Sequence, residues 1–190
     1  MLGRMLKLRA AILAGGKSTR FGRDKSLESF SNNNEPYTIC CYRMLTPLNL
    51  DPLIISDNSN KFSSYGIRSI VDIIPDKGPL GGIYTGLIHA NADAILVLTC
   101  DMPHVSKNMI ERLIKDYMKI NESTFFKIDT KIYPFPGIYS VSSLLIIKKC
   151  LDENKLSVIE YIKMLNYKNS GDTAGDMSSV VGYGAYAFYQ

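Results

Sequence analysis

The sequence predicts an α/β fold in a single domain, with three layers (αβα) and a mostly parallel sheet. Short apolar segments typical of buried strands alternate with segments of helical periodicity. The connections between them are short, which favours βαβ units and parallel strands. The 190 residues, of which 46% are hydrophobic, are enough for one sizeable core.

The first half of the chain alternates regularly. Its apolar runs are bounded by Gly, Pro, Asn or Ser, and Ser106 is a good N-cap for a helix. The run 94–98 is wholly apolar, as in the middle of a parallel sheet. We expect strands at 9–14, 53–55, 67–71 and 94–98, and helices at 37–45, 80–90 and 106–117.

The second half of the chain is less regular. Segments 124–128 and 132–134 are expected to pair as strands, and 139–151 and 157–165 to form helices. Segment 166–179 is rich in Asn, Gly, Ser and Asp and predicts a loop, whereas 180–190 has no clear pattern. We expect one domain over 1–190, with 1–8 as a flexible or short N-terminal extension.

Positive charge is concentrated at the start of the chain. Residues 1–25 hold seven of the 22 basic residues and one of the 18 acidic residues. This distribution predicts an anionic ligand near the front of the chain. For Arg4, Lys7 and Arg9 the simpler interpretation is a solvated basic tail.

The four cysteines include no C-x-x-C pair, which favours neither a zinc site nor a disulfide framework. Reduced thiols in a cytoplasmic protein fit this pattern best. No apolar run approaches the roughly 20 residues of a membrane helix, and no secretory leader is expected.

Residues 13–25 carry the chemistry; they read Leu-Ala-Gly-Gly-Lys-Ser-Thr-Arg-Phe-Gly-Arg-Asp-Lys. Two glycines after a buried strand let the backbone turn sharply and approach a ligand. Successive N–H groups in such a turn bind anions, and Lys17, Arg20 and Lys25 add positive charge. This predicts a phosphate-binding loop at the carboxyl end of the first strand, where open α/β sheets bind ligands.

Two well-known nucleotide motifs are absent from this segment. It contains neither G-x-x-x-x-G-K-[ST] nor G-x-G-x-x-G. The alternative is a Gly-rich surface loop with incidental basic residues. The fixed spacing of Arg20, Gly22, Asp24 and Lys25 favours the ligand.

The pattern L-A-G-G-x-S-x-R-x-G-x-D-K resembles the signature loop of molybdenum cofactor guanylyltransferases. The resemblance implies a nucleotidyltransferase fold of the Rossmann-like, nucleotide-diphospho-sugar-transferase type. It covers about residues 8–120 well. Asp72, followed by G-P-L-G-G at 78–82, and C-D-M-P at 100–103 match further segments of that family in order.

For two of these matches the residues leave an alternative open. Asp101 follows a buried strand and could bind Mg²⁺, or it could begin a turn. Asp72 could instead cap a strand end, and Gly81 could serve packing alone.

Two segments depart from the family pattern. Ser56 stands where relatives have a first Asn, while Asn58 matches the second, which affects base recognition. Near the C-terminus, Asp172 or Asp176 could replace the family's Asn motif as a metal ligand.

The resemblance implies transfer of GMP from GTP to the terminal phosphate of molybdopterin, with release of pyrophosphate and Mg²⁺ as cofactor. It implies Arg20, Lys25 and Asp101 as catalytic residues and Asp101 as the metal ligand. The residues expected to bind the nucleotide are Leu13, Ala14, Gly15, Gly16, Lys25, Asp72, Gly81 and Asp101. Neither nucleic acid nor membrane is expected as a partner, whereas transient contact with other enzymes of the cofactor's synthesis is.

Two further functions stay open. One is a related transferase: an adenosylcobinamide-phosphate guanylyltransferase, a molybdenum cofactor cytidylyltransferase or a sugar-phosphate nucleotidyltransferase. The other is a non-catalytic nucleotide-binding module, supported only by the altered C-terminal segment.

Overall fold

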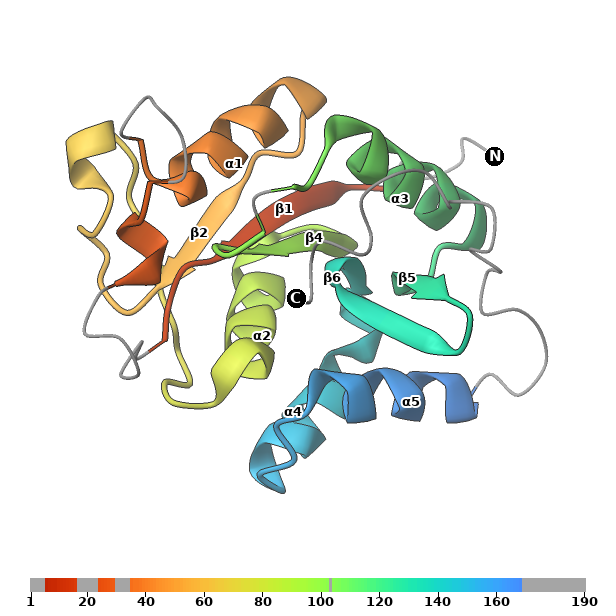
Figure 1. The fold of residues 1–190 in the computed structure, drawn as a ribbon. Coiled ribbons are helices and arrows are strands. Elements are labelled where there is room, and N and C mark those ends of the chain that lie inside the picture. The colour runs from red at the N-terminus through yellow and green to blue at the C-terminus, as the bar shows by residue number, and fades with distance from the viewer. Residues whose placement is uncertain (1–5, 17–23, 30–34, 103, 169–190) are drawn as a thin grey trace.

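A six-stranded sheet in the order β3-β2-β1-β4-β6-β5 forms the centre of the molecule (Figure 1). The computed structural model describes residues 6–16, 24–29, 35–102 and 104–168. Strands β3, β2, β1 and β4 are parallel, and β6 and β5 run antiparallel at one side, so the sheet is mostly parallel as predicted. The strands are β1 (Leu8–Leu13), β2 (Leu53–Ser56), β3 (Ile70–Val71), β4 (Ala94–Thr99), β5 (Thr124–Ile128) and β6 (Lys131–Ser140).

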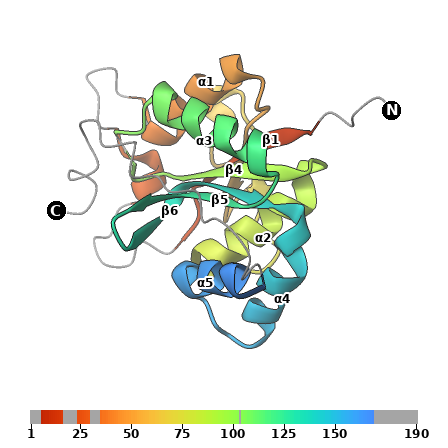
Figure 2. The same cartoon turned by 90° about the vertical axis from the view of Figure 1, so that its right-hand side faces the viewer.

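Helices cover both faces of this sheet and complete the three predicted layers. Figure 2 shows α1 and α3 on one side and α2, α4 and α5 on the other. The helices are α1 (Tyr37–Leu45), α2 (Gly78–Ala90), α3 (Lys107–Ile120), α4 (Leu144–Asp152) and α5 (Val158–Lys168). Within the described residues, four short 3-10 segments lie between these helices and strands, at Lys25–Leu27, Thr46–Leu48, Ser63–Tyr65 and Val141–Ser143.

The alternation of side chains along the strands explains the two cores. In β1, Ala10 and Ile12 face α1 and α3, whereas Ala11 and Leu13 face α2, α4 and α5. Every residue of β4 from Ala94 to Leu98 is buried, because helices cover both faces of that strand.

The regular first half of the chain follows the predicted pattern closely. Helix α1 has the predicted bounds, and Ser106 caps α3 by accepting a hydrogen bond from the Met109 N–H at 3.3 Å. Strand β3 is shorter than expected, because only Ile70 and Val71 pair with β2.

The prediction for 132–151 is wrong in one respect. Strand β6 continues to Ser140, so the expected helix begins only at Leu144. In the pairing with β5, Phe125 lies opposite Gly137 but Phe126 opposite Tyr133. The residues 134–136 therefore bulge out of this pairing, which lets two prolines occupy the strand without donating to it.

The start of the chain belongs to the fold earlier than expected. Leu6 packs against the core, Lys7 exchanges hydrogen bonds with Asp93, and Leu8 begins β1. Arg9 is no solvated tail residue, because it pairs with Asp51 at 2.6 Å. In the part of the chain that the structure describes, no helix is long and apolar enough to cross a membrane.

Candidate active site

The carboxyl ends of the parallel strands bring several of the predicted site residues to one edge of the sheet. Leu13 at the end of β1 lies opposite Ile55 of β2 and Thr99 of β4. The segments that follow these three strands therefore begin side by side. Gly15 and Asp101 come from two of them, as the sequence predicted.

Of the two glycines after β1, Gly16 has a backbone that other residues would resist. Its φ is +122°, in the region that favours glycine, whereas a Cβ on Gly15 would lie 3.4 Å from the Ser56 Cα atom, an ordinary contact distance. Both glycines are exposed, whereas Leu13 and Ala14 are buried. The carbonyl of Leu13 accepts the Cys100 N–H, and that of Ala14 accepts the Lys61 ammonium. Nucleotide contacts of these residues stay a prediction.

The Gly-rich segment, residues 15–23, is followed by Asp24, whose side chain is held by hydrogen bonds. Its carboxylate accepts the Ser26 N–H at 3.0 Å and the Ser26 hydroxyl at 2.6 Å, which caps the 3-10 turn of Lys25–Leu27. The buried Thr38 of α1 donates to the Ser26 carbonyl at 2.8 Å. These bonds place the exposed Lys25 beside α1. Arg20 lies outside the described residues.

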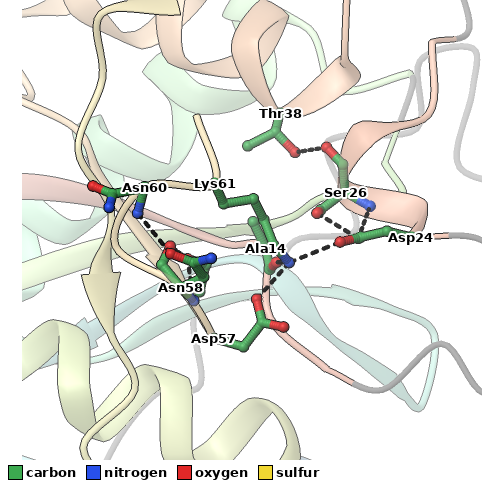
Figure 3. Close-up of polar contacts among 9 residues, drawn as sticks. Ala14, Asp24, Ser26, Thr38, Asp57, Asn58, Asn60 and Lys61 are labelled. Atoms are coloured by element: carbon green, nitrogen blue, oxygen red, sulfur yellow. Dashed lines mark hydrogen bonds and ion pairs between the residues drawn. The ribbon is translucent and has the colours of Figure 1, made fainter. Parts of the chain in front are cut away.

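Lys61 joins the two flanks of that segment, as Figure 3 shows. Its ammonium lies 3.3 Å from the Ala14 carbonyl, 2.9 Å from Asp24 and 2.5 Å from Asp57. Burial alone would lower the pKa of Lys61, but the hydrogen bonds and charges of Asp57 and Asp24 outweigh burial and raise it. Burial would raise the pKa of Asp24, yet its bonds to Ser26 and Lys61 hold that pKa below its usual value. Both groups are therefore charged near neutral pH.

Asp101 lies exposed just beyond β4, where one carboxylate oxygen accepts the Thr99 hydroxyl at 2.7 Å. Next to it, burial raises the pKa of the Cys100 thiol to about 12, and the charges of Asp101 and Asp24 add to that effect. Asp24 therefore lies close enough to the end of β4 for its charge to act on the Cys100 thiol. Tyr37 of α1 donates to the Met102 carbonyl and fixes the chain beyond Asp101.

The donor set at this edge fits a cation that needs few protein ligands. Among the described residues no group of three or more His, Cys, Asp or Glu side chains could hold a metal. Mg²⁺ is bound by one or two carboxylates together with phosphate oxygens and water, rather than by an all-protein cage. The exposed Asp101 carboxylate suits such a site.

Asp72 lies beyond β3 and is oriented by α2. One carboxylate oxygen accepts the Thr85 hydroxyl at 2.6 Å and the Ile74 N–H at 3.0 Å. A Cβ on Gly81 would lie 2.8 Å from the Ile74 carbonyl and 3.3 Å from the Asp72 Oδ2 atom. Gly81 thus has the packing role that the sequence left open, and its contact with a nucleotide stays a prediction.

The departure at Ser56 has a local explanation. The Ser56 hydroxyl is buried and donates to the Asn58 carbonyl at 2.7 Å, so it closes the turn after β2. The Asn58 side chain accepts the Asn60 N–H at 2.9 Å. Asp172 and Asp176 lie outside the described residues, as does the tail 180–190.

A family model described as the MobA-like NTP transferase domain matches residues 10–164. The chain belongs to this family. A probable molybdenum cofactor guanylyltransferase from Flavobacterium johnsoniae is 32% identical over 83% of this chain and 82% of its own length. One with the same description from Clostridium perfringens is 35% identical over 82% of this chain and 77% of its own length.

Solved structures of nucleotidyltransferases share the fold of this MobA-like chain. Molybdopterin-guanine dinucleotide biosynthesis protein A from Archaeoglobus fulgidus has a TM-score of 0.70 and 20% identity, over 82% of this chain and 79% of its own. CMP:2-keto-3-deoxy-manno-octonic acid synthetase has a TM-score of 0.66 and 13% identity, over 85% and 86%. Both chains confirm the predicted nucleotide-diphospho-sugar-transferase-like fold.

Sequence reasoning missed Lys61, Asp57 and Thr85. Asp57 and Lys61 stand four residues apart after a predicted strand, a spacing that suggests an ion pair with each other. Nothing in the local sequence links Lys61 to Ala14 and Asp24, which lie 47 and 37 positions away. Thr85 lies within α2, and its sequence neighbours give no sign that its hydroxyl donates to Asp72.

Proposed function

We propose that this chain is a molybdenum cofactor guanylyltransferase. It transfers GMP from GTP to the terminal phosphate of molybdopterin and releases pyrophosphate. Its membership of the MobA-like family and its likeness to guanylyltransferases over four-fifths of its length carry the proposal. The placement of Gly15, Gly16 and Asp101 at one sheet edge agrees with it.

The reaction needs positioning and charge stabilisation, and no covalent enzyme intermediate. An oxygen of the acceptor phosphate attacks the α-phosphorus of GTP, and the bond from that phosphorus to the bridging oxygen of the β-phosphate breaks. The N–H groups of Gly15 and Gly16 would face the triphosphate. Lys25, together with Arg20, would stabilise the negative charge that builds up on the departing pyrophosphate.

Asp101 would hold Mg²⁺, which neutralises charge on the phosphates when it is bound. Thr99 keeps the Asp101 carboxylate in place through its hydrogen bond. Asp72 would bind the base or ribose of GTP through the oxygen that Thr85 does not engage. Leu13, Ala14 and Gly81 would shape the nucleotide site through their backbone.

We also propose one nucleotidyltransferase domain for the chain, with GTP and molybdopterin as its substrates. We expect transient contact with other enzymes of cofactor synthesis, because molybdopterin must pass from them to this chain. All four cysteines are free thiols, as is typical of proteins in the reducing cytoplasm, where we place the enzyme.

The proposed roles are tested by measuring the activity of variants of Asp101 and of Lys25. Asp101→Asn removes the proposed metal ligand, and Lys25→Gln removes the proposed phosphate contact. We expect each variant to lower pyrophosphate release by at least about a hundredfold, with thermal unfolding close to that of the unmodified protein because both side chains are exposed. Near-normal Mg²⁺-dependent turnover by Asp101→Asn would reject the assigned role.

A further inference from the structure

Lys61 is more enclosed than the other lysines that form ion pairs in the described part of the chain. Its side chain is only 9% exposed, and three oxygen acceptors from three segments surround its ammonium. A buried ammonium is costly unless it is paired and hydrogen-bonded, which explains why so many acceptors converge on it. Lys148 is a contrast: it is 53% exposed and pairs with Asp152 on the same helix, a kind of pair that contributes little.

The acceptors of Lys61 have a particular arrangement in the fold. Ala14 and Asp24 are the described flanks of the Gly-rich segment, and Asp57 lies in the turn after β2 (Figure 3). Lys61, which follows the neighbouring strand β2, therefore binds Ala14 and Asp24 on both flanks of the segment. Asp24 is held from its other side by Ser26, which in turn is bound by Thr38 of α1. A continuous set of bonds runs from the turn after β2 to α1.

The charges of this group bear on an anionic ligand. Asp24 and Asp57 are 39% and 63% exposed, so both carboxylates would repel a triphosphate at this edge if they were unpaired. Lys61 lies within 2.9 Å of each. Its single positive charge offsets part of this negative charge.

We propose that Lys61 is a positioning residue for the triphosphate site, fastening Ala14 to Asp24 and neutralising the Asp24 carboxylate. This rests on the proposed function, because it assumes a nucleoside triphosphate as the ligand. Lys61 need not touch the nucleotide. It acts by holding Ala14 and Asp24 in place on either side of the Gly-rich segment that binds the triphosphate.

The experiment compares GTP binding by the full chain with Mg²⁺ and without acceptor, measured by calorimetry. Lys61→Gln removes the positive charge and leaves the Asp24 and Asp57 carboxylates without their cation, and we expect a dissociation constant for GTP on the order of tenfold higher. The double variant Lys61→Gln/Asp24→Asn removes the Asp24 charge as well, but Asp57 is still without its cation and Ala14 is still not joined to residue 24. Its dissociation constant should lie between those of the single variant and the unmodified protein. Lys148→Gln is the matched control and should bind GTP normally.

Three results would overturn the proposal. One is unchanged GTP affinity in folded Lys61→Gln, which would leave Lys61 a purely structural role. A second is a double variant that binds no better than the single variant. If Lys61→Gln does not fold, the double variant decides alone, and affinity equal to that of the unmodified protein would reject the proposal.

The unmodified protein separates this proposal from the proposed function. If it binds CTP instead of GTP, the comparison runs with CTP, since Lys61 concerns the phosphates and not the base. If it binds a nucleoside triphosphate but makes no product with molybdopterin, the acceptor is wrong and the Lys61 comparison stands. Absence of binding to either triphosphate would overturn both.

Discussion

Thr85 shows how a single buried hydroxyl directs a carboxylate. It donates to Asp72 at 2.6 Å and accepts the Ile73 N–H at 3.1 Å, and it is fully buried in α2. Asp72 was predicted from the sequence because it follows a strand and precedes G-P-L-G-G. Its partner could not be, since the contact depends on how α2 packs against the turn after β3.

We predict that Thr85→Val lowers the free energy of unfolding by about 1–3 kcal/mol. Valine has a similar shape but leaves the Ile73 N–H and the Asp72 carboxylate without the hydroxyl. Thr85→Ser keeps the hydroxyl and is the matched control. Urea unfolding measures both variants, and equal stability of Thr85→Val and Thr85→Ser would show that the hydroxyl contributes nothing.

Elements with a regular pattern were predictable, and the exceptions have physical causes. Helix α1 and strand β4 follow directly from apolar periodicity and from a wholly apolar run. Strand β6 was predicted too short because Pro134, Pro136 and Gly137 are typical of breaks in a strand. The bulge against β5 accommodates them, and this bulge depends on pairing across the sheet.

Helix α3 carries an ion pair that makes stability depend on pH. Burial alone would raise the pKa of Asp116, but the hydrogen bonds and charges of Arg112 and Lys119 lower it below its usual value of 3.8. The unfolded chain therefore binds the proton more readily than the folded one. The stabilisation by Asp116 is complete above about pH 3.8 and is lost as the pH falls through the lower folded value.

We predict that Asp116→Asn lowers the free energy of unfolding by at most about 1 kcal/mol at pH 7, because Arg112 and Lys119 are partly exposed. The difference from the unmodified protein should shrink as the pH falls below 3.8. Urea unfolding at several pH values between 7 and 3 tests this. A difference that stays constant over that range would contradict it.

At the scale of the whole molecule, one sheet is shared by two cores and ends at the candidate site. Leu96 of β4 belongs to the core under α1 and α3, and its neighbour Val97 to the core under α2, α4 and α5. The same strand ends beside Asp101. The sequence predicted this layered arrangement, whereas the bonds of Lys61 that join separate segments needed the structure. The nucleotide site at the carboxyl edge of the sheet stays a prediction.

We predict that Leu96→Ala and Val97→Ala each destabilise the entire fold. Each removes a fully buried side chain, and Leu→Ala in a core costs about 2–5 kcal/mol. Because both cores share β4, unfolding followed by far-UV circular dichroism and by tyrosine fluorescence should coincide in both variants. Two separate transitions in either variant would mean that the two cores unfold independently.

The proposed reaction of the whole molecule is the transfer of GMP from GTP to molybdopterin. The most direct measurement is pyrophosphate release with Mg²⁺ from GTP and from CTP, each with and without molybdopterin, with mass spectrometry of the product. We expect release from GTP only when molybdopterin is present, together with a product that carries guanine. Release from CTP in place of GTP, or no dinucleotide from either, would contradict it.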